Sequence, residues 1–259
     1  DLTGRVAGVY TQFGLDSSPA DSNTGHGTHI AVSAIGDGQS NGNATGMAPN
    51  ADLVMYALEH DPTGVFGRIG SIYDLLRDAE QKTARIAINA WGANGNYGQY
   101  SADSRSVDIF VHDKPSMLPL FSVGDLGSQG ASQITPPSTA KNVLAIGASE
   151  TGSTSGSVAS FSSIGPSLDG RVKPDLVAPG VDVCSGRAEE AKTSPGLTCS
   201  SETHANGDDV YTMLSGTSQA TAVAGGVAAL TREFIREEVG ISAPSGSLVK
   251  AAMIDRKST

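Results

Sequence analysis

The chain has 259 residues, of which 38% are hydrophobic and 32 are glycines, which is long enough and apolar enough for a sizeable core and unlike a disordered chain. Its net charge of −10 at pH 7 argues against nucleic acid as a partner, because phosphates attract basic surfaces. No run of 18 apolar residues occurs, so we expect neither a membrane-spanning helix nor a membrane partner.

Short apolar runs alternate with helical patterns along the chain, which predicts an α/β fold with a parallel sheet. In chain order the pattern predicts a strand at 5–10, a helix at 26–35, a strand at 52–58, a helix at 69–81, a strand at 84–90, a helix at 106–112, strands at 117–123 and 143–148, and a long helix from 218 to about 238. The helix at 69–81 is amphipathic, with one apolar face made by Ile72, Leu75, Leu76 and Ala79.

No repeat, charge block or linker interrupts this pattern, and we therefore expect one domain over residues 1–259. The first residues, Asp1-Leu2-Thr3, are unlike a signal peptide, which indicates a trimmed form if the protein is secreted.

A histidine motif opens the first predicted helix. Its residues are Gly25-His26-Gly27-Thr28-His29. A serine nucleophile needs a base within hydrogen-bonding reach, most often a histidine, so His26 is the candidate base. We expect His29, one turn further on, to be an ordinary packed residue of the helix.

A serine motif, Ser215-Gly216-Thr217-Ser218, opens the long helix. At a helix N-terminus the backbone N–H groups and the helix dipole favour a developing oxyanion, so Ser218 is the candidate nucleophile. Gly216 leaves room for a substrate to approach. The structural alternative is a serine that merely caps the helix.

The two motifs in this order resemble the subtilisin-like serine proteases, and the likeness extends over residues 2 to about 254. The segments Gly46–Val54, Phe161–Pro166 and Lys173–Gly180 resemble further family segments, and the nearest likeness is to the oxidatively stable alkaline serine proteases of Bacillus. The resemblance implies a doubly wound, mostly parallel sheet flanked by helices, with the active site at the carboxyl ends of the strands. Those relatives continue into a C-terminal β-domain, for which there is no sequence here.

The resemblance also implies where a substrate binds. Asn89-Ala90-Trp91-Gly92 is similar to the family segment whose backbone pairs with the substrate as an added strand, and we extend the substrate-binding residues to Ser122, Val123 and Gly124.

The aspartate that completes the family's catalytic triad is missing. Aligning Gly14 and the following Leu-Asp places Gln12 in that slot, whereas aligning the start of the strand places Tyr10 there. The aspartate fixes the histidine tautomer, and its loss in serine proteases, subtilisin included, lowers the rate by about 10⁴. Asp16 and Asp21 are nearby carboxylates that could compensate.

The oxyanion-hole motif departs from the family as well. Relatives carry Ala-Gly-Asn-Glu-Gly, whereas this chain has Val123-Gly124-Asp125-Leu126-Gly127, with Asp125 in the place of the asparagine. An ionised carboxylate has no proton to donate, and one such donor is worth about 10²–10³ in rate. A protonated Asp125 could donate, as an aspartate does in the related sedolisins.

The two cysteines, Cys184 and Cys199, lie 15 residues apart in a polar segment. A disulfide between them would close a loop worth about 3 kcal/mol, and the alternative is a pair of free thiols.

These observations give three functional hypotheses: a secreted serine endopeptidase acting through an acyl-enzyme on Ser218, an impaired relative that binds extended peptides without efficient cleavage, or a redesigned variant of an active parent. We expect a monomer that acts on peptides or proteins and needs no cofactor for its chemistry, and the resemblance together with the acidic balance implies structural calcium. Asn43-Ala44-Thr45 matches the pattern of a glycosylation acceptor.

Overall fold

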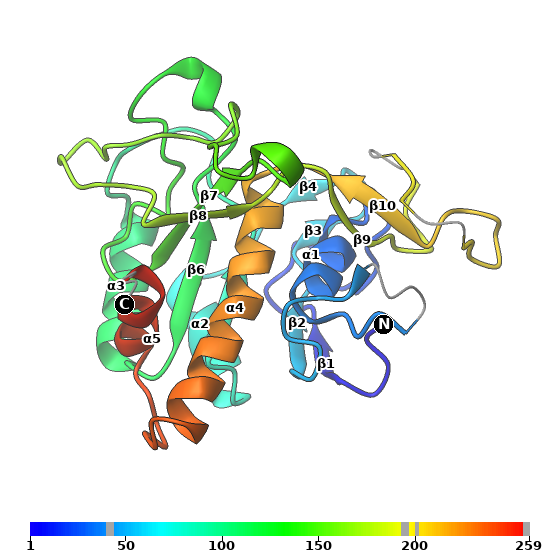
Figure 1. The fold of residues 1–259 in the computed structure, drawn as a ribbon, viewed down its shortest axis with the longest axis horizontal. Coiled ribbons are helices and arrows are strands. Elements are labelled where there is room, and N and C mark those ends of the chain that lie inside the picture. The colour runs from blue at the N-terminus through cyan, green and yellow to red at the C-terminus, as the bar shows by residue number, and fades with distance from the viewer. Residues whose placement is uncertain (40–43, 193–196, 200–201, 256–259) are drawn as a thin grey trace. The chain divides into compact units, whose positions relative to one another are not determined.

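The protein was studied as a computed structural model that describes residues 1–39, 44–192, 197–199 and 202–255 (Figure 1). Asn43 of the acceptor triplet lies outside the described residues. The chain forms two compact units, one made of Asp1–Gly70 and Asp182–Ser215, the other of Ser71–Val181 and Gly216–Thr259. The sequence pattern did not predict this division.

Within its described residues (1–39, 44–70, 182–192, 197–199 and 202–215), the first unit forms one α-helix and three pairs of strands. The strands are β1 (Val6–Tyr10) parallel to β2 (Leu53–Tyr56), β3 (Glu59–His60) antiparallel to β4 (Val65–Phe66), and β9 (Val183–Gly186) antiparallel to β10 (Tyr211–Leu214). The helix, α1 (His26–Ile35), packs on β9 and is buried from His29 to its end. The predicted strand at 52–58 is shorter than expected, because the parallel pairing with β1 ends at Tyr56, and its residues are half-buried.

The helix α1 is bounded by glycines at both ends. Gly25 is the N-cap and has a left-handed backbone with φ 70°, which glycine adopts without strain. Gly36 is the C-cap, and its N–H donates to the carbonyl of Val32. The predicted bounds of 26–35 are confirmed.

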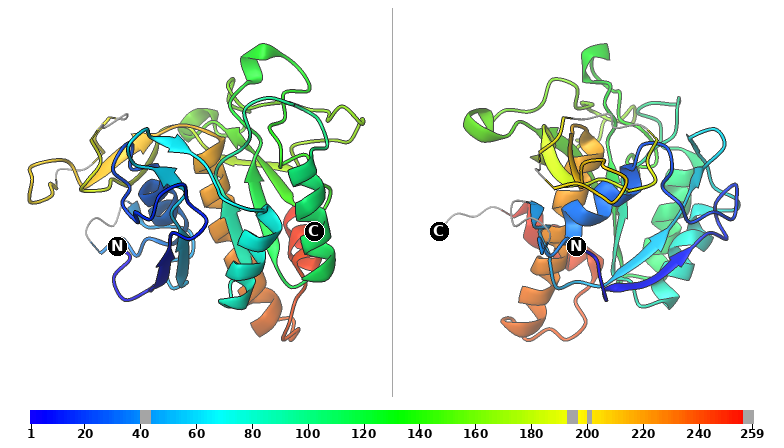
Figure 2. Two further views of the ribbon diagram at one scale, coloured as in Figure 1. Left: turned by 180° about the vertical axis from the view of Figure 1, so that it is seen from behind. Right: turned by 90° about the vertical axis from the view of Figure 1, so that its right-hand side faces the viewer.

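The second unit contains a four-stranded parallel sheet in the order β5-β6-β7-β8. The strands are β5 (Ile86–Asn89), β6 (Leu118–Ser122), β7 (Leu144–Ser149) and β8 (Leu176–Pro179); the helices are α2 (Ile72–Gln81), α3 (Ala102–Asp113), α4 (Thr217–Glu237) and α5 (Gly246–Ile254), with short 3-10 turns at Gly127–Gln129 and Gly152–Thr154. Figures 1 and 2 show α4 and α5 on one face of this sheet and α2 and α3 on the other. The α/β prediction is confirmed.

The core of this unit lies between the sheet and α4, which contacts all four strands. It includes Leu120, Leu144 and Ile146 from the strands and Ala220 and Ala224 from the helix, all nearly inaccessible to solvent. Small residues on α4 let the helix approach the strands closely, and this fixes the start of α4 at the edge where the parallel strands end. Within the described residues no helix combines the length and the apolarity that crossing a bilayer requires.

Candidate active site

The first turn of α4 lies at the carboxyl ends of β5 and β6. The Ser218 hydroxyl donates to the carbonyl of Ala90, just after β5, at 2.9 Å. The backbone N–H of Thr217 donates to Asp125 Oδ1 at 2.8 Å, and the N–H of Gly124 donates to the Thr217 hydroxyl at 3.2 Å. Three residues selected from the sequence, Ser218, Asp125 and Ala90, therefore lie together in the second unit.

Ser218 is not the cap of its helix, so the structural alternative for this residue is wrong. The N-cap is Gly216, no side chain of that residue caps the helix, and Ser218 is the second helical residue. A Cβ on Gly216 would lie 2.7 Å from Gln219 Oε1 and 3.2 Å from Asp125 Oδ2, so a larger residue would crowd both side chains. Ser218 is free of the capping role that would explain it structurally.

Asp125 accepts a hydrogen bond at the helix start. Its Oδ1 takes the N–H of Thr217, one of the donors that an α-helix leaves unpaired at its N-terminus. A helix N-terminus favours negative charge, so this contact suits an ionised carboxylate. To donate to an oxyanion, Asp125 would have to carry a proton on its other oxygen, Oδ2.

The predicted substrate-binding residues follow these two strands. Ala90–Gly92 come directly after β5, and Ser122 ends β6 and is followed by Val123 and Gly124. The Ser122 hydroxyl donates to the Trp91 carbonyl at 3.5 Å, and the Trp91 ring meets the Phe121 ring edge-on at a centroid distance of 5.5 Å. The two segments are thus neighbours at one edge of the sheet.

Sequence reasoning missed Thr135, whose side chain contacts both segments, at Gly92 and at Gly124. The only local signal is the Pro136-Pro137 pair that follows it, which marks a turn but not a site.

The other predicted catalytic residues belong to the first unit. His26 is the first residue of α1, and its N–H donates to the Thr24 hydroxyl at 3.3 Å. Gln12 is exposed in the turn after β1. Tyr10 is the last residue of β1, and its ring stacks on Tyr56 at a centroid distance of 5.6 Å.

The two neighbouring carboxylates have structural contacts. Asp21 Oδ2 accepts the N–H of Thr28 at 2.6 Å, which caps the first turn of α1. Asp16 accepts the N–H of Ser18 at 3.1 Å and, through its other oxygen, the N–H of Asp61 at 2.8 Å. Asp21 thus holds the backbone of the histidine motif, whereas Asp16 ties the loop after β1 to Asp61.

His29 is a packed residue, as expected. It is fully buried, and its Nε2 lies 3.0 Å from the carbonyl oxygen of Val183 and 3.2 Å from that of Thr212. Burial lowers the pKa of His29 from 6.5 to about 4, against the opposing effect of the two carbonyls. The ring is therefore neutral and donates from Nε2 to the β9–β10 pair.

Cys184 and Cys199 form a disulfide, with their Cα atoms 6.0 Å apart, so the free-thiol alternative is wrong. Cys184 lies on β9, and Thr198, next to Cys199, forms a bridge with Thr212 of β10. The disulfide therefore links β9 to the segment that pairs with the other side of β10 at Thr212.

The described part of the chain offers no carboxylate-rich ligand set for calcium. Among the described residues, no three histidine, cysteine, aspartate or glutamate side chains gather as a metal-binding group. The side chains present in that part of the chain do not fit a carboxylate-rich calcium site.

Comparison with known proteins identifies relatives over nearly the whole chain. The sequence profile described as the subtilase family matches residues 10–257. The serine protease AprX of Bacillus subtilis (strain 168) is 30% identical over 240 residues, which is 89% of this chain and 53% of that protein. The alkaline protease of Alkalihalobacillus alcalophilus is 32% identical over 218 residues, 84% of this chain and 47% of that protein. This chain thus spans about half the length of these two relatives.

Solved structures show the same fold. Sphericase superposes with a TM-score of 0.68 at 25% identity, covering 96% of this chain and 76% of that one. A cold-adapted subtilisin-like serine proteinase superposes with a TM-score of 0.64 at 20% identity, covering 98% of this chain and 76% of that one.

Proposed function

Because this chain belongs to the subtilase family, we propose that it is a serine endopeptidase domain that cleaves peptide bonds through an acyl-enzyme on Ser218. The observation that carries the proposal is the position of Ser218 in the first turn of α4, beside Ala90 and Asp125 at the carboxyl ends of β5 and β6. A hydroxyl in that position has the helix N-terminus behind it to stabilise negative charge on the attacked carbonyl.

In the proposed reaction His26 removes the proton of Ser218 as the hydroxyl attacks, and later gives that proton to the leaving amine. The Ser218 hydroxyl must first leave its bond to the Ala90 carbonyl. We place Gln12 in the slot of the triad aspartate, with Tyr10 as the alternative. Neither carries the negative charge that would stabilise the imidazolium, so we propose a slower enzyme than a subtilase with a complete triad.

The second candidate function is an impaired subtilase that binds extended peptides along Ala90-Trp91-Gly92. Two contacts favour it. Asp125 accepts from Thr217 instead of presenting a donor, and Ser218 donates to a backbone carbonyl. A binding protein would keep the substrate segments and lose only the chemistry.

The proposal also covers the compartment and the oligomeric state of the domain. Disulfides persist in oxidising compartments, so Cys184–Cys199 supports a secreted, extracellular protein. We further propose a monomer without a nucleic-acid partner, in keeping with the acidic net charge of −10. Structural calcium remains a prediction from the family resemblance.

The test is labelling with a serine-directed fluorophosphonate. We expect the native protein to be labelled on Ser218 and Ser218→Ala to remain unlabelled. Ser215→Ala is the matched control and should keep the label, since it removes a hydroxyl of the same motif that is hydrogen-bonded to Asp182. A folded native protein that takes no label would instead support the peptide-binding function.

A further inference from the structure

The side chain of Gln219 follows the candidate nucleophile directly. Gln219 is the third residue of α4, next to Ser218, and is only 2% exposed. Its amide group carries two N–H donors on the nitrogen and an acceptor on the oxygen. No other described residue forms a hydrogen bond with this amide, and its atoms are not enclosed. A ligand can therefore reach an unpaired amide beside Ser218.

A point beside Gly216 is surrounded by three polar groups. From the position that a Cβ on Gly216 would occupy, Gln219 Oε1 lies at 2.7 Å, Asp125 Oδ2 at 3.2 Å and the backbone nitrogen of Ser218 at 3.8 Å. The first distance is too short for a carbon atom, whereas an oxygen that accepts a hydrogen bond lies about 2.7–3.2 Å from its donor. The surroundings of this point therefore suit a hydrogen-bonded oxygen.

The proposed reaction generates negative charge near this point. When the Ser218 hydroxyl attacks a peptide carbonyl, the carbonyl oxygen becomes an oxyanion and needs hydrogen-bond donors. The backbone N–H of Ser218 is one of the donors that a helix leaves unpaired at its N-terminus. Asp125 accepts the N–H of Thr217 and, while ionised, has no proton to donate. A second donor therefore has to come from another side chain, and Gln219 lies beside the same point.

The charge of Asp125 also orients the amide of Gln219. A half-turn about the last side-chain bond of Gln219 exchanges Oε1 with Nε2. With Oε1 toward Gly216, the amide oxygen and Asp125 Oδ2 lie beside the same point, which an ionised carboxylate disfavours. With Nε2 toward Gly216, an N–H group lies there instead. The carboxylate therefore favours the orientation in which Gln219 donates.

Asp125 cannot move away from this point, because both of its neighbours in the chain are held. The N–H of Leu126 donates to the Ser163 hydroxyl at 3.1 Å, and the N–H of Ser163 donates to the Gly124 carbonyl at 2.9 Å. Ser163 is fully buried. The N–H of Gly124 also donates to the Thr217 hydroxyl at 3.2 Å. The carboxylate therefore stays beside the start of α4.

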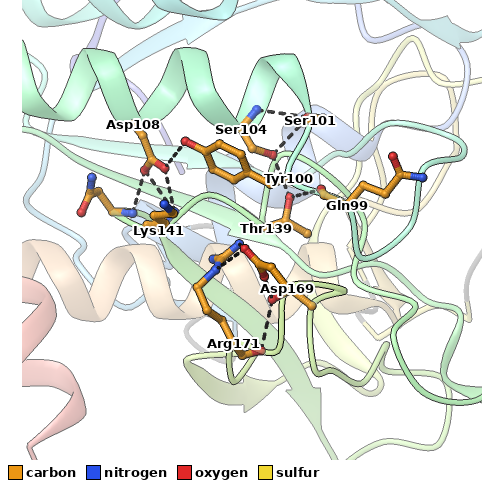
Figure 3. A network of polar contacts seen from close by, with 11 residues as sticks. Gln99, Tyr100, Ser101, Ser104, Asp108, Thr139, Lys141, Asp169 and Arg171 are labelled. Carbon is orange, nitrogen blue, oxygen red and sulfur yellow. Dashed lines mark hydrogen bonds and ion pairs between the residues drawn. The ribbon is translucent and has the colours of Figure 1, made fainter.

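A buried polar network supports the same segment from the side of α3 (Figure 3). The N–H of Thr135 donates to the carbonyl of Val123 at 2.8 Å, and the network holds the chain that follows Thr135. In it the Thr139 hydroxyl donates to the Gln99 carbonyl at 2.7 Å and lies 2.7 Å from the Ser104 hydroxyl of α3. Because fully satisfied buried networks are rigid, the segment after β6 has little freedom to shift.

We propose that Gln219 is a catalytic residue of this site, whose Nε2 donates a hydrogen bond to the oxyanion in place of the donor that Asp125 does not supply. The proposal rests on the proposed function, because it assumes that Ser218 attacks a peptide carbonyl. An amide donates at every pH, and no proton is transferred. The hydrogen bond strengthens as the oxygen gains charge, so it raises kcat more than it lowers KM.

The experiment compares kcat and KM for hydrolysis of an unstructured peptide by the native protein and by variants of Gln219. Gln219→Met keeps the length of the side chain without a donor, and Gln219→Glu keeps its shape without a donor when ionised. We expect each change to lower kcat by about 10²–10³, the loss typical of one oxyanion-hole donor, and to leave KM nearly unchanged. Thr221→Val is the matched control. It removes a fully buried hydroxyl from the same helix and should keep the native kcat.

A donor on the neighbouring side chain should rescue the methionine variant. Adding Asp125→Asn to Gln219→Met supplies an amide beside the same point without changing the volume, so kcat should rise at least about tenfold above that of Gln219→Met. A defect of packing would not be repaired in this way. Native kcat in both Gln219 variants, or an equal loss of kcat in Thr221→Val, would overturn the assignment.

Labelling and NMR separate this assignment from the proposed function. If a fluorophosphonate labels Ser218 at a rate that neither Gln219 variant changes, the endopeptidase stands and Gln219 is not a donor. If the native protein is neither labelled nor active, the endopeptidase fails, and an acetylated tri-alanine peptide is titrated instead, because its terminal carboxylate can take the place of the oxyanion. The side-chain amide signals of Gln219, identified by their loss in Gln219→Met, should then shift, and unmoved signals would overturn the assignment.

Discussion

Asp125 brings a carboxylate to the point where the proposed reaction generates negative charge. Its Oδ1 accepts from Thr217, and its Oδ2 lies toward Gly216. An amide in this position could keep the first contact through its oxygen and present its NH₂ group where Oδ2 lies. The isosteric change therefore tests the charge without altering the packing.

We expect Asp125→Asn to raise peptide hydrolysis at pH 8 by about 10²-fold or more, because an amide donates at every pH and a carboxylate only when protonated. Hydrolysis of an unstructured peptide from pH 4 to 10 measures both forms. Native activity equal to or above that of the variant at pH 8 would show that Asp125 is not an oxyanion-hole residue.

The missing triad carboxylate is a second residue-level defect. We expect Gln12→Asp to raise hydrolysis, by up to about 10⁴ if the other groups are in place, because a carboxylate would orient His26 and stabilise its cation. The comparison is Tyr10→Asp, which removes a ring stacked on Tyr56 and so also disturbs β1 and β2. A gain confined to Tyr10→Asp would assign the slot to that residue, and no gain in either would point to Asp125 as the dominant limit.

At the scale of elements, the sequence predicts best where local chemistry is sufficient. The predicted apolar face of α2 is buried as expected, at Ile72, Leu75, Leu76 and Ala79. The helix begins at Ile72 instead of residue 69 because the Ser71 side chain accepts the N–H of Asp74 and so caps it there. The sequence predicts that α4 begins at Ser218, whereas the helix begins at Thr217, because its N-cap is Gly216.

Some elements were not predicted from the sequence. The strands β9 and β10 pair across more than twenty intervening residues, and the four-residue sequence of β9, Val-Cys-Ser-Gly, is too short to show an alternation of its own. The helix α5 was also missed, although Ser245 caps it by accepting the N–H of Leu248, a signal that the sequence does contain. Of the site, the motifs identify Ser218 and Asp125, whereas Thr135 acquires its position only through long-range contacts.

The packing of α1 on β9 and β10 has a pH dependence of its own. Because the pKa of His29 is about 4 in the folded protein and 6.5 as a reference, the unfolded chain binds more protons between these values. The contribution of His29 to the free energy of unfolding is therefore fully present above pH 6.5. It is lost as the pH falls towards 4, and the loss amounts to up to about 3 kcal/mol.

The variant His29→Gln keeps an N–H donor for the carbonyls of Val183 and Thr212 but does not titrate. Urea unfolding at several pH values between 4 and 8 should show a smaller loss of stability on acidification in this variant than in the native protein. Equal slopes for the two proteins would mean that His29 is not the residue responsible.

At the scale of the whole molecule, the motifs and the α/β alternation predict the family and the fold class. They do not predict the division into two units. The first unit combines residues 1–70 with residues 182–215, so the whole of the 71–181 segment separates its two parts in the chain. No composition change marks the boundaries at Gly70 or Val181. The units are defined by the contacts that residues make within each of them, and no local pattern encodes those contacts.

The disulfide lies entirely within the second segment of the first unit, and this gives a prediction about the molecule as a whole. The bond joins residues 15 apart, so it should contribute about 3 kcal/mol by restricting the unfolded chain. Reduction should therefore favour opening of the first unit, because proteins open locally in cooperative groups of residues. Hydrogen exchange followed by mass spectrometry, with and without reductant, should show lost protection in Asp1–Gly70 and Asp182–Ser215 and little change in β5 to β8. The variant with both cysteines changed to serine should behave like the reduced protein in the absence of reductant. Equal loss of protection across the four-stranded sheet would mean that the two units open as one, and that the disulfide stabilises the whole molecule instead of the part that contains the histidine motif.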